Sequence, residues 1–433
     1  MNADTAMSPL AGLLPRAEAV RLVNLVLRRR AQLDEAFDES ASRGSLSRAT
    51  PQDRALCYAI TATVLRRKGE IDHLLSQLLA KPLPRSSGLA REILLTTAAQ
   101  LVFMRTAAHA AVALAVTIAK ADPQARHFSG LVNAVGRRLA DAGKGGLPDD
   151  PAINTPSWLF ARWLARFGPD TAREIARAHS QAAPLDLAVT GDAEGWAQRL
   201  GGTHVSAQTV RLSDWHGSIT DLPGFAEGQW WVQDEAAAIP ARLFGDVKGL
   251  KVLDLCAAPG GKTAQLASGG ANVTAVDRSA RKMQRLEENL RRLRLSAETV
   301  VADALNYQPS ASFDAVLLDA PCAATGIIRR HPDIPYLRKP EQIVELAALQ
   351  HMLIVKAASL LRPGGTLMYC TCSLEAEEGE HHLSSLPSNL TLLPLSAGDF
   401  ALRPEWLDAQ GCLRTLPSQG LDGFFAMRLA AAG

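Results

Sequence analysis

The chain has 433 residues, of which 47% are hydrophobic and 21% are charged, and its formal net charge is +2. These values are ordinary for a soluble globular protein, and the length allows about three domains. The six cysteines show neither the paired spacing of a zinc site nor a disulfide framework. A disulfide-stapled fold is therefore excluded, and no metal is expected.

Basic charge is concentrated in the first third of the chain. Residues 1–145 contain 20 Lys and Arg against 12 Asp and Glu, whereas the remaining residues contain 26 against 32. Such an excess could attract a polyanion, although a helical domain with solvated arginine faces would give the same count. The candidate phosphate contacts in this region include Arg28, Arg29, Arg66 and Arg67.

No segment predicts export or membrane insertion. The apolar stretch 9–14 is too short for a secretory signal, and Arg16 and Glu18 follow it at once. The longest apolar run, 107–119, falls short of the ~20 residues that span a bilayer. We expect a cytoplasmic protein with reduced thiols, and a monomer by default.

Apolar residues recur at helical spacing through residues 1–142, which predicts an all-α bundle. Thr50-Pro51 is a helix start, and the prolines of Lys81-Pro82-Leu83-Pro84 end the helix before them. The predicted helices span residues 17–29, 53–67, 71–79, 91–105, 107–120 and 128–139. A linker rich in Gly and Pro covers residues 143–156. A small α+β domain is expected over 157–234, with helices at 158–167 and 170–181 and a strand at 185–190.

Strand and helix patterns alternate through residues 235–433, which predicts an α/β domain with a parallel, doubly wound sheet. The strand candidates are residues 252–255, 273–276, 298–301, 315–318 and 366–369. Ligands of such sheets bind just beyond the carboxyl ends of the strands.

A tight glycine turn follows the first of these strands. It comprises Cys256, Ala257, Ala258, Pro259, Gly260, Gly261 and Lys262. Its glycines allow a close approach of backbone to a ligand, but the dinucleotide fingerprint G-x-G-x-x-G is absent. Gly261-Lys262-Thr263 fits the end of a Walker A loop, whose first glycine is replaced here by Cys256. A P-loop NTPase therefore remains an alternative.

Acidic residues stand at the ends of four predicted strands. Asp277 lies 23 residues after Asp254, a spacing at which an acid accepts hydrogen bonds from ribose hydroxyls. Asp303 and Asp319 end the next two strands. Strand-end aspartates often only cap the following helix, but four around one crevice favour a binding site.

Two cysteines follow two of the predicted strands, Cys322 in Asp319-Ala320-Pro321-Cys322 and Cys372 in Thr371-Cys372-Ser373. Both thiols should face the same crevice, since both strands end there. A thiolate beside a methyl donor suits C5 methylation of a pyrimidine, because C5 becomes nucleophilic only after addition at C6. The remaining cysteines are expected to be structural.

These motifs together resemble those of the RNA 5-methylcytosine methyltransferases. The run Ala324-Thr325-Gly326-Ile327-Ile328-Arg329-Arg330-His331-Pro332-Asp333 is similar to the bacterial RsmB branch, which methylates a cytosine of small-subunit ribosomal RNA. The N-terminal bundle resembles the RNA-binding NusB fold, with Lys81-Pro82-Leu83 and Val132-Asn133-Ala134-Val135 at the expected places. The resemblance covers essentially the whole chain. Two departures are Ala323, where relatives commonly have a serine, and 187–190, where the family usually has Arg-Val-Asn.

The resemblance implies a role for each motif. Cys372 would be the nucleophile that adds to cytosine C6, and Cys322 would assist breakdown of the covalent adduct. Asp319 would hold the N3 edge of the base. S-adenosylmethionine would be held by the glycine turn 256–262 with Asp277, Asp303 and Asp319. Arg329 and Arg330 are further candidates for contacting the RNA. A non-catalytic RNA-binding protein is the second alternative, on the basic charge of the bundle.

Overall fold

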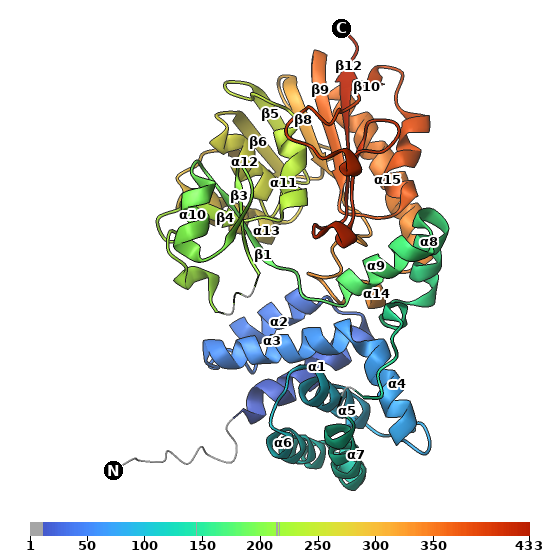
Figure 1. Cartoon of the computed structure of the whole chain (residues 1–433). Helices are drawn as coiled ribbons and strands as arrows, with labels where there is room; N and C mark the ends of the chain where they lie inside the picture. The colour runs from blue at the N-terminus through green and yellow to red at the C-terminus, as the bar shows by residue number, and fades with distance from the viewer. Residues whose placement is uncertain (1–11, 144, 214, 216) are drawn as a thin grey trace. The chain divides into compact units, whose positions relative to one another are not determined.

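The computed structural model describes residues 12–143, 145–213, 215 and 217–433. They form two compact units (Figure 1). The first holds the described residues up to Gln181 together with the segment Ile328–Arg338, and the second holds Ala182–Ile327 and Lys339–Gly433. Among the described residues, no helix combines the length and apolar character that crossing a membrane requires.

The first unit is helical, as predicted. Val23, Leu94 and Val132 are among the side chains buried in its core. The Thr50 hydroxyl accepts a hydrogen bond from Asp53 N at 3.1 Å and so caps α3 at the predicted start. The helices are α1 (Leu13–Arg29), α2 (Leu33–Ser42), α3 (Pro51–Arg66), α4 (Lys68–Leu78), α5 (Ala90–Ala98), α6 (Ala108–Ala121), α7 (Ser129–Ala142), α8 (Ser157–Phe167) and α9 (Pro169–His179), with α5 continuing into the π-helix η1 (Ala99–Phe103) and α7 followed by the 3-10 helix η3 (Pro151–Asn154).

The helices α8 and α9 belong to the first unit, whereas the sequence pattern groups residues 157–181 with the α+β domain. Polar contacts to α4 account for the difference. The Asn154 amide donates to Glu70 Oε2 at 2.7 Å, and Glu70 N donates back to Asn154 Oδ1 at 3.1 Å. The Ser180 hydroxyl lies 3.4 Å from the same amide nitrogen. These contacts join both ends of the segment 154–180 to the bundle.

The second unit begins with a small antiparallel sheet of order β2-β3-β1-β4. Its elements are β1 (Leu185–Val189), α10 (Ala193–Leu200), β2 (Thr203–Ser206), β3 (Thr209–Leu212) and β4 (Trp230–Val232). The buried Asp186 carboxylate and the Arg211 guanidinium form two hydrogen bonds of 2.7 Å across β1 and β3. This paired charge satisfies a carboxylate that would be costly to bury alone.

The main sheet has the order β10-β12-β9-β8-β5-β6-β7 and is mixed rather than wholly parallel. The predicted strands form its parallel part, and β12 pairs antiparallel with β9. A parallel return needs a crossover, usually a helix, and the chain between β9 and β12 contains only 3-10 turns and short strands. The strands are β5 (Lys251–Leu255), β6 (Asn272–Asp277), β7 (Glu298–Val301), β8 (Phe313–Asp319), β9 (Leu361–Thr371), β10 (Leu390–Leu392), β11 (Leu413–Thr415) and β12 (Phe424–Ala431).

Helices cover both faces of this sheet (Figure 1). On one face, α15 packs against Leu253, Leu318 and Tyr369. The other face is covered by α11, α12 and α13. Side chains alternate between the two faces along each strand, so both are apolar and buried. The helices are α11 (Glu235–Arg242), α12 (Gly261–Ser268), α13 (Ala280–Leu293), α15 (Pro340–Ser359) and, in the first unit, the short α14 (Ile334–Leu337).

Candidate active site

The glycine turn links β5 to α12. Two of its residues have left-handed backbone conformations, and a hydrogen bond to β6 holds the turn in place. Cys256 has φ 60° and Gly260 has φ 100°, both in the left-handed region. A Cβ at Gly260 would lie 2.5 Å from Leu286 Cγ, so this position accepts only glycine without rearrangement. Ala257 N donates to Val276 O at 3.1 Å, which holds the turn against the neighbouring strand β6.

A cavity of about 430 Å³ lies beside this turn, within the second unit. Five of the predicted donor-binding residues line it: Cys256, Ala258, Asp277, Asp303 and Asp319. Apolar side chains complete its wall, among them Val276, Leu305, Leu349 and Leu353. Ala257, Pro259, Gly260, Gly261 and Lys262 shape the turn but do not line the cavity.

Two of the acids are held in place by backbone amides. Asp277 Oδ1 accepts from Ser279 N at 2.8 Å, and its Oδ2 accepts from Ala258 N at 3.2 Å. Asp303 Oδ1 accepts from Leu305 N at 2.8 Å. Each carboxylate oxygen can accept more than one hydrogen bond, so both acids still offer acceptors to a ligand in the cavity.

Asp254, the fourth predicted strand-end acid, has a different position. Its side chain is fully buried within β5, and Oδ2 accepts from the Thr263 hydroxyl at 2.6 Å. No hydrogen-bond partner is found for Oδ1 in the described part of the chain. Burial raises the pKa of Asp254 to about 7. Asp254 therefore anchors α12 to β5, and three acids rather than four line the cavity.

Lys262 and Asp319 form an ion pair at the end of β8. Lys262 Nζ donates to Asp319 Oδ2 at 2.7 Å and lies 5.1 Å from the centre of the Phe424 ring. Burial disfavours the ammonium charge, but the Asp319 carboxylate outweighs it and the pKa of Lys262 is raised. Asp319 is one-third exposed and so remains open to the cavity.

The two predicted cysteines meet in the same wall. Cys322 Sγ lies 3.5 Å from Cys372 Sγ, and both residues line the cavity. The hydrogen bond to Cys372, followed by burial, raises the pKa of Cys322 well above that of a free thiol. Cys322 thus keeps its proton near neutral pH, as a thiol that can donate to its neighbour.

Arg329 and Arg330, the RNA-contact candidates that follow Cys322 in the sequence, belong to the first unit. Arg329 is only 5% exposed, and its carbonyl accepts from Arg66 Nη2 at 3.1 Å. In the same segment, Asp333 Oδ2 accepts from Leu33 N at 2.9 Å, and the Tyr336 hydroxyl donates to Leu65 O at 2.7 Å. The segment is therefore docked on α2 and α3.

The arginine candidates of the bundle differ in their surroundings. Arg28 forms two hydrogen bonds of 2.7 and 3.0 Å with the buried Glu92. Arg67 contacts Glu70 at 3.2 Å and stacks over the Phe103 ring. Arg29 is exposed at the end of α1. Phosphate contact is thus easiest for Arg29.

Sequence reasoning misses Gln350 and Glu378, which contact the loops of both cysteines. The one signal is the acid-rich run Glu375-Ala376-Glu377-Glu378 directly after the second cysteine motif. In a sequence, such a run is typical of a solvated turn, and nothing marks Glu378 as fully buried.

The residues that line the cavity fit S-adenosylmethionine. Asp277 can accept hydrogen bonds from ribose hydroxyls, Asp303 and an apolar wall suit an adenine, and carboxylates suit a sulfonium cation. A glycine turn after the first strand, with acids at the ends of the next strands, defines the class of S-adenosylmethionine-dependent methyltransferases.

Comparison with known proteins narrows the class to a family. The model of the 16S rRNA methyltransferase RsmB/F family matches residues 245–430, and that of the NusB family matches 13–141. Ribosomal RNA small subunit methyltransferase B of Sodalis glossinidius is 35% identical over 428 residues, covering 91% of this chain and 95% of the relative. The protein of that name from Pseudomonas putida is 36% identical, with coverages of 83% and 85%. The chain belongs to this methyltransferase family, and the P-loop alternative is rejected.

Two solved structures share the fold. A methyltransferase homolog from Pyrococcus horikoshii is 28% identical with a TM-score of 0.55, covering 65% of this chain and 98% of that one. NSun6 from the same organism, solved with SFG, has a TM-score of 0.55 at 19% identity, with coverages of 64% and 98%. With the two family models, the prediction of a NusB-like bundle and a Rossmann-like methyltransferase domain is confirmed.

Proposed function

We propose that the protein methylates C5 of a cytosine in small-subunit ribosomal RNA through a covalent adduct between Cys372 and C6 of the base. The observation that carries this proposal is the 3.5 Å separation of Cys322 Sγ and Cys372 Sγ in the wall of the donor cavity. Methylation of an amino or hydroxyl group needs no thiol. Two thiols suit a reaction in which one is covalently occupied while the other assists its release.

In this reaction Cys372 adds to C6 as a thiolate, which makes C5 electron-rich. When bound, S-adenosylmethionine supplies the electrophilic methyl group that C5 takes up. Loss of the C5 proton then expels Cys372 and restores the aromatic ring. The raised pKa of Cys322 supports its assignment to the second role, because it stays a thiol that stabilises the neighbouring thiolate by a hydrogen bond.

Asp319 is assigned to the N3 edge of the cytosine. Addition at C6 increases electron density at N3, which takes up a proton from water and returns it when the ring is restored. While N3 is protonated, a carboxylate can accept a hydrogen bond from it. Lys262 holds Asp319 Oδ2 at 2.7 Å, which leaves Oδ1 as an acceptor for the base. The base must leave its stack to be attacked, since addition to C6 occurs perpendicular to the ring.

Ribosomal RNA is proposed as the substrate because relatives matched over most of their length carry the name ribosomal RNA small subunit methyltransferase B. The basic bundle is proposed to contribute phosphate contacts, which supply affinity without sequence specificity. Under the alternative of a non-catalytic RNA-binding protein, removal of the Cys372 thiol would change nothing.

The test is transfer of labelled methyl from S-adenosylmethionine to unmodified small-subunit ribosomal RNA, with digestion to identify the product. We expect wild type to form 5-methylcytosine, Cys372→Ala to form none, and Cys322→Ala to accumulate a protein–RNA adduct that survives denaturation. Methylation by wild type at any position other than cytosine C5, or full activity of Cys372→Ala, would contradict the proposal.

A further inference from the structure

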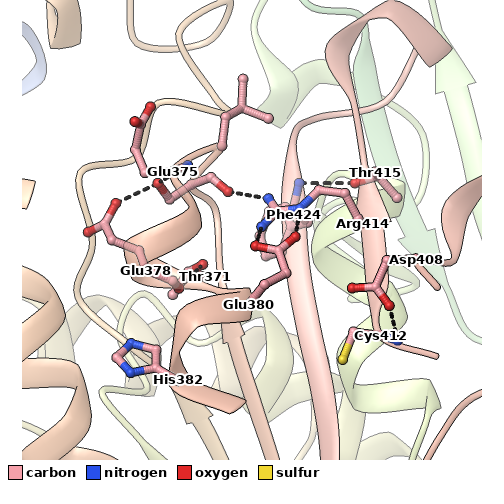
Figure 2. Close-up of polar contacts among 12 residues, drawn as sticks. Thr371, Glu375, Glu378, Glu380, His382, Asp408, Cys412, Arg414, Thr415 and Phe424 are labelled. Atoms are coloured by element: carbon pink, nitrogen blue, oxygen red, sulfur yellow. Dashed lines mark hydrogen bonds and ion pairs between the residues drawn. The ribbon is translucent and has the colours of Figure 1, made fainter. Parts of the chain in front are cut away.

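The loops that carry the two cysteines are joined by one buried carboxylate, that of Glu378. Glu378 (labelled in Figure 2) lies in the 3-10 turn after β9. Its exposed fraction is 0%. Its Oε1 accepts from Ala323 N at 2.8 Å, and its Oε2 accepts from the Ser373 hydroxyl at 2.5 Å. Each donor is the immediate neighbour of one cysteine, Ala323 of Cys322 and Ser373 of Cys372.

The opposite flank of each cysteine is held by the same group of residues. Gln350 Nε2 donates to Glu378 Oε1 at 3.0 Å and to Pro321 O at 2.9 Å. The Thr371 hydroxyl donates to the Glu378 carbonyl at 3.1 Å. Pro321 and Thr371 are the residues that precede the two cysteines. Both peptide segments are therefore fixed on each side of the thiol.

Glu378 and Gln350 together form a clamp around the two cysteine loops, and further contacts fix the positions of these two residues. Gln350 Oε1 lies 3.1 Å from both the Tyr369 hydroxyl and His382 Nε2, which sets the orientation of the amide. Arg414 donates to Ser373 O and pairs with Glu380 at 2.9 Å. Figure 2 shows the pair of Arg414 and Glu380. A buried carboxylate is stable only when its hydrogen bonds are complete, and such a network has a single low-energy arrangement.

We infer that Glu378, with Gln350, is a positioning residue that sets the separation of the two thiols for the covalent reaction. It touches neither the cavity nor a reacting atom, and it acts through the backbone on either side of Cys322 and Cys372. The inference rests on the proposed function, because only a reaction that uses both thiols needs their separation to be fixed. Misplacement of reacting groups by about 1 Å costs on the order of 100-fold in rate.

The experiment compares Glu378→Ala and Glu378→Gln with wild type by two readouts. The first is the rate of fluorescence gain with dibromobimane, which fluoresces strongly once both of its ends have joined neighbouring thiols, with Cys322→Ala defining the background. It needs neither RNA nor methyl donor. The second is kcat for methyl transfer, together with the KM for S-adenosylmethionine.

We expect Glu378→Ala to lose the cross-link and about 100-fold in kcat, with KM for the donor within twofold of wild type. Glu378→Gln should retain most of both, since the amide oxygen can still accept from Ala323 N and the Ser373 hydroxyl can turn to accept. Glu235→Ala is the matched control, at a 1% exposed acid of the same unit that bonds Thr209 and Arg242. It should lower thermal stability only.

Unchanged cross-linking and kcat in Glu378→Ala would overturn the inference, as would equal losses in Glu235→Ala. If Glu378→Ala does not fold, Ser373→Ala and Gln350→Ala each break one arm of the clamp and are judged by the same criteria. Failure of the proposed function is recognised separately, since wild type would then cross-link its two thiols and yet make no 5-methylcytosine.

Discussion

Lys262 Nζ lies 2.7 Å from Asp319 Oδ2, and this pair connects the glycine turn after β5 to the end of β8. Lys262 belongs to the turn that shapes the donor site, and Asp319 is the acid assigned to the target base. The cationic side chain that a Walker A loop would direct toward phosphate is directed here toward a carboxylate. Under the proposed function, this ion pair would link the site of the methyl donor to the site of the target base.

Replacing Lys262 by Met should impair catalysis more than folding. The substitution keeps an apolar stem against Phe424 but leaves Asp319 without the ammonium group that orients it. We expect kcat to fall by about 100-fold. Steady-state methyl transfer and thermal melting measure the two effects. Lys251→Met, at an exposed position of β5, is the control and should match wild type. If kcat of Lys262→Met stays within twofold of wild type, Lys262 does not orient Asp319 for catalysis.

The wild-type free energy of unfolding should fall as pH rises toward 7, and replacing Asp254 by Asn should remove this decrease. Burial raises the pKa of Asp254 to about 7, so folding favours its protonated form. The unfolded chain releases this proton near pH ~3.9. Between these values the folded state binds more protons, and the free energy of unfolding falls as pH rises toward 7. The Asn amide oxygen can still accept from Thr263 and cannot ionise.

We therefore expect Asp254→Asn to gain stability relative to wild type as pH rises from 4.5 to about 7, and the difference to level off above that. Urea unfolding at a series of pH values measures it. Glu288→Gln, on an exposed part of α13, serves as the control and should follow the wild-type curve. A constant difference between Asp254→Asn and wild type across this range would show that the carboxyl is ionised throughout.

Substitutions of the adjacent residues Arg28 and Arg29 should have different effects, one on thermal stability and the other on RNA binding. Arg29 is exposed, so Arg29→Ala should weaken RNA binding and reduce the slope of log affinity against log salt by about 1. Arg28 pairs with Glu92, which is 1% exposed, so Arg28→Ala should chiefly lower the melting temperature. Titrations at several salt concentrations and melting curves test both. An unaltered salt slope in Arg29→Ala would exclude a phosphate contact there.

Short-range patterns predict the parallel strands well, because a run such as Ala315–Leu318 is apolar on both faces and ends in an acid. They miss α2, since Leu33–Ser42 has few apolar residues and its first turn is capped by Asp333, 300 residues away. They also miss the antiparallel direction of β12, which depends on the absence of a crossover helix. They do not single out Glu378 either, because its partners Ala323 and Gln350 lie 55 and 28 residues away in the sequence.

The segment Ile328–Arg338 has a consequence for biosynthesis. During translation, helices α1 to α9 emerge long before this segment, which supplies Asp333 to the start of α2 and Tyr336 to the end of α3. The first unit is therefore completed only after much of the parallel sheet has been made. A fragment that ends at residue 181 would therefore lack the contacts of Asp333 and Tyr336 with the bundle, together with the packing of Tyr336 and Leu337 against the core around α1 and α3.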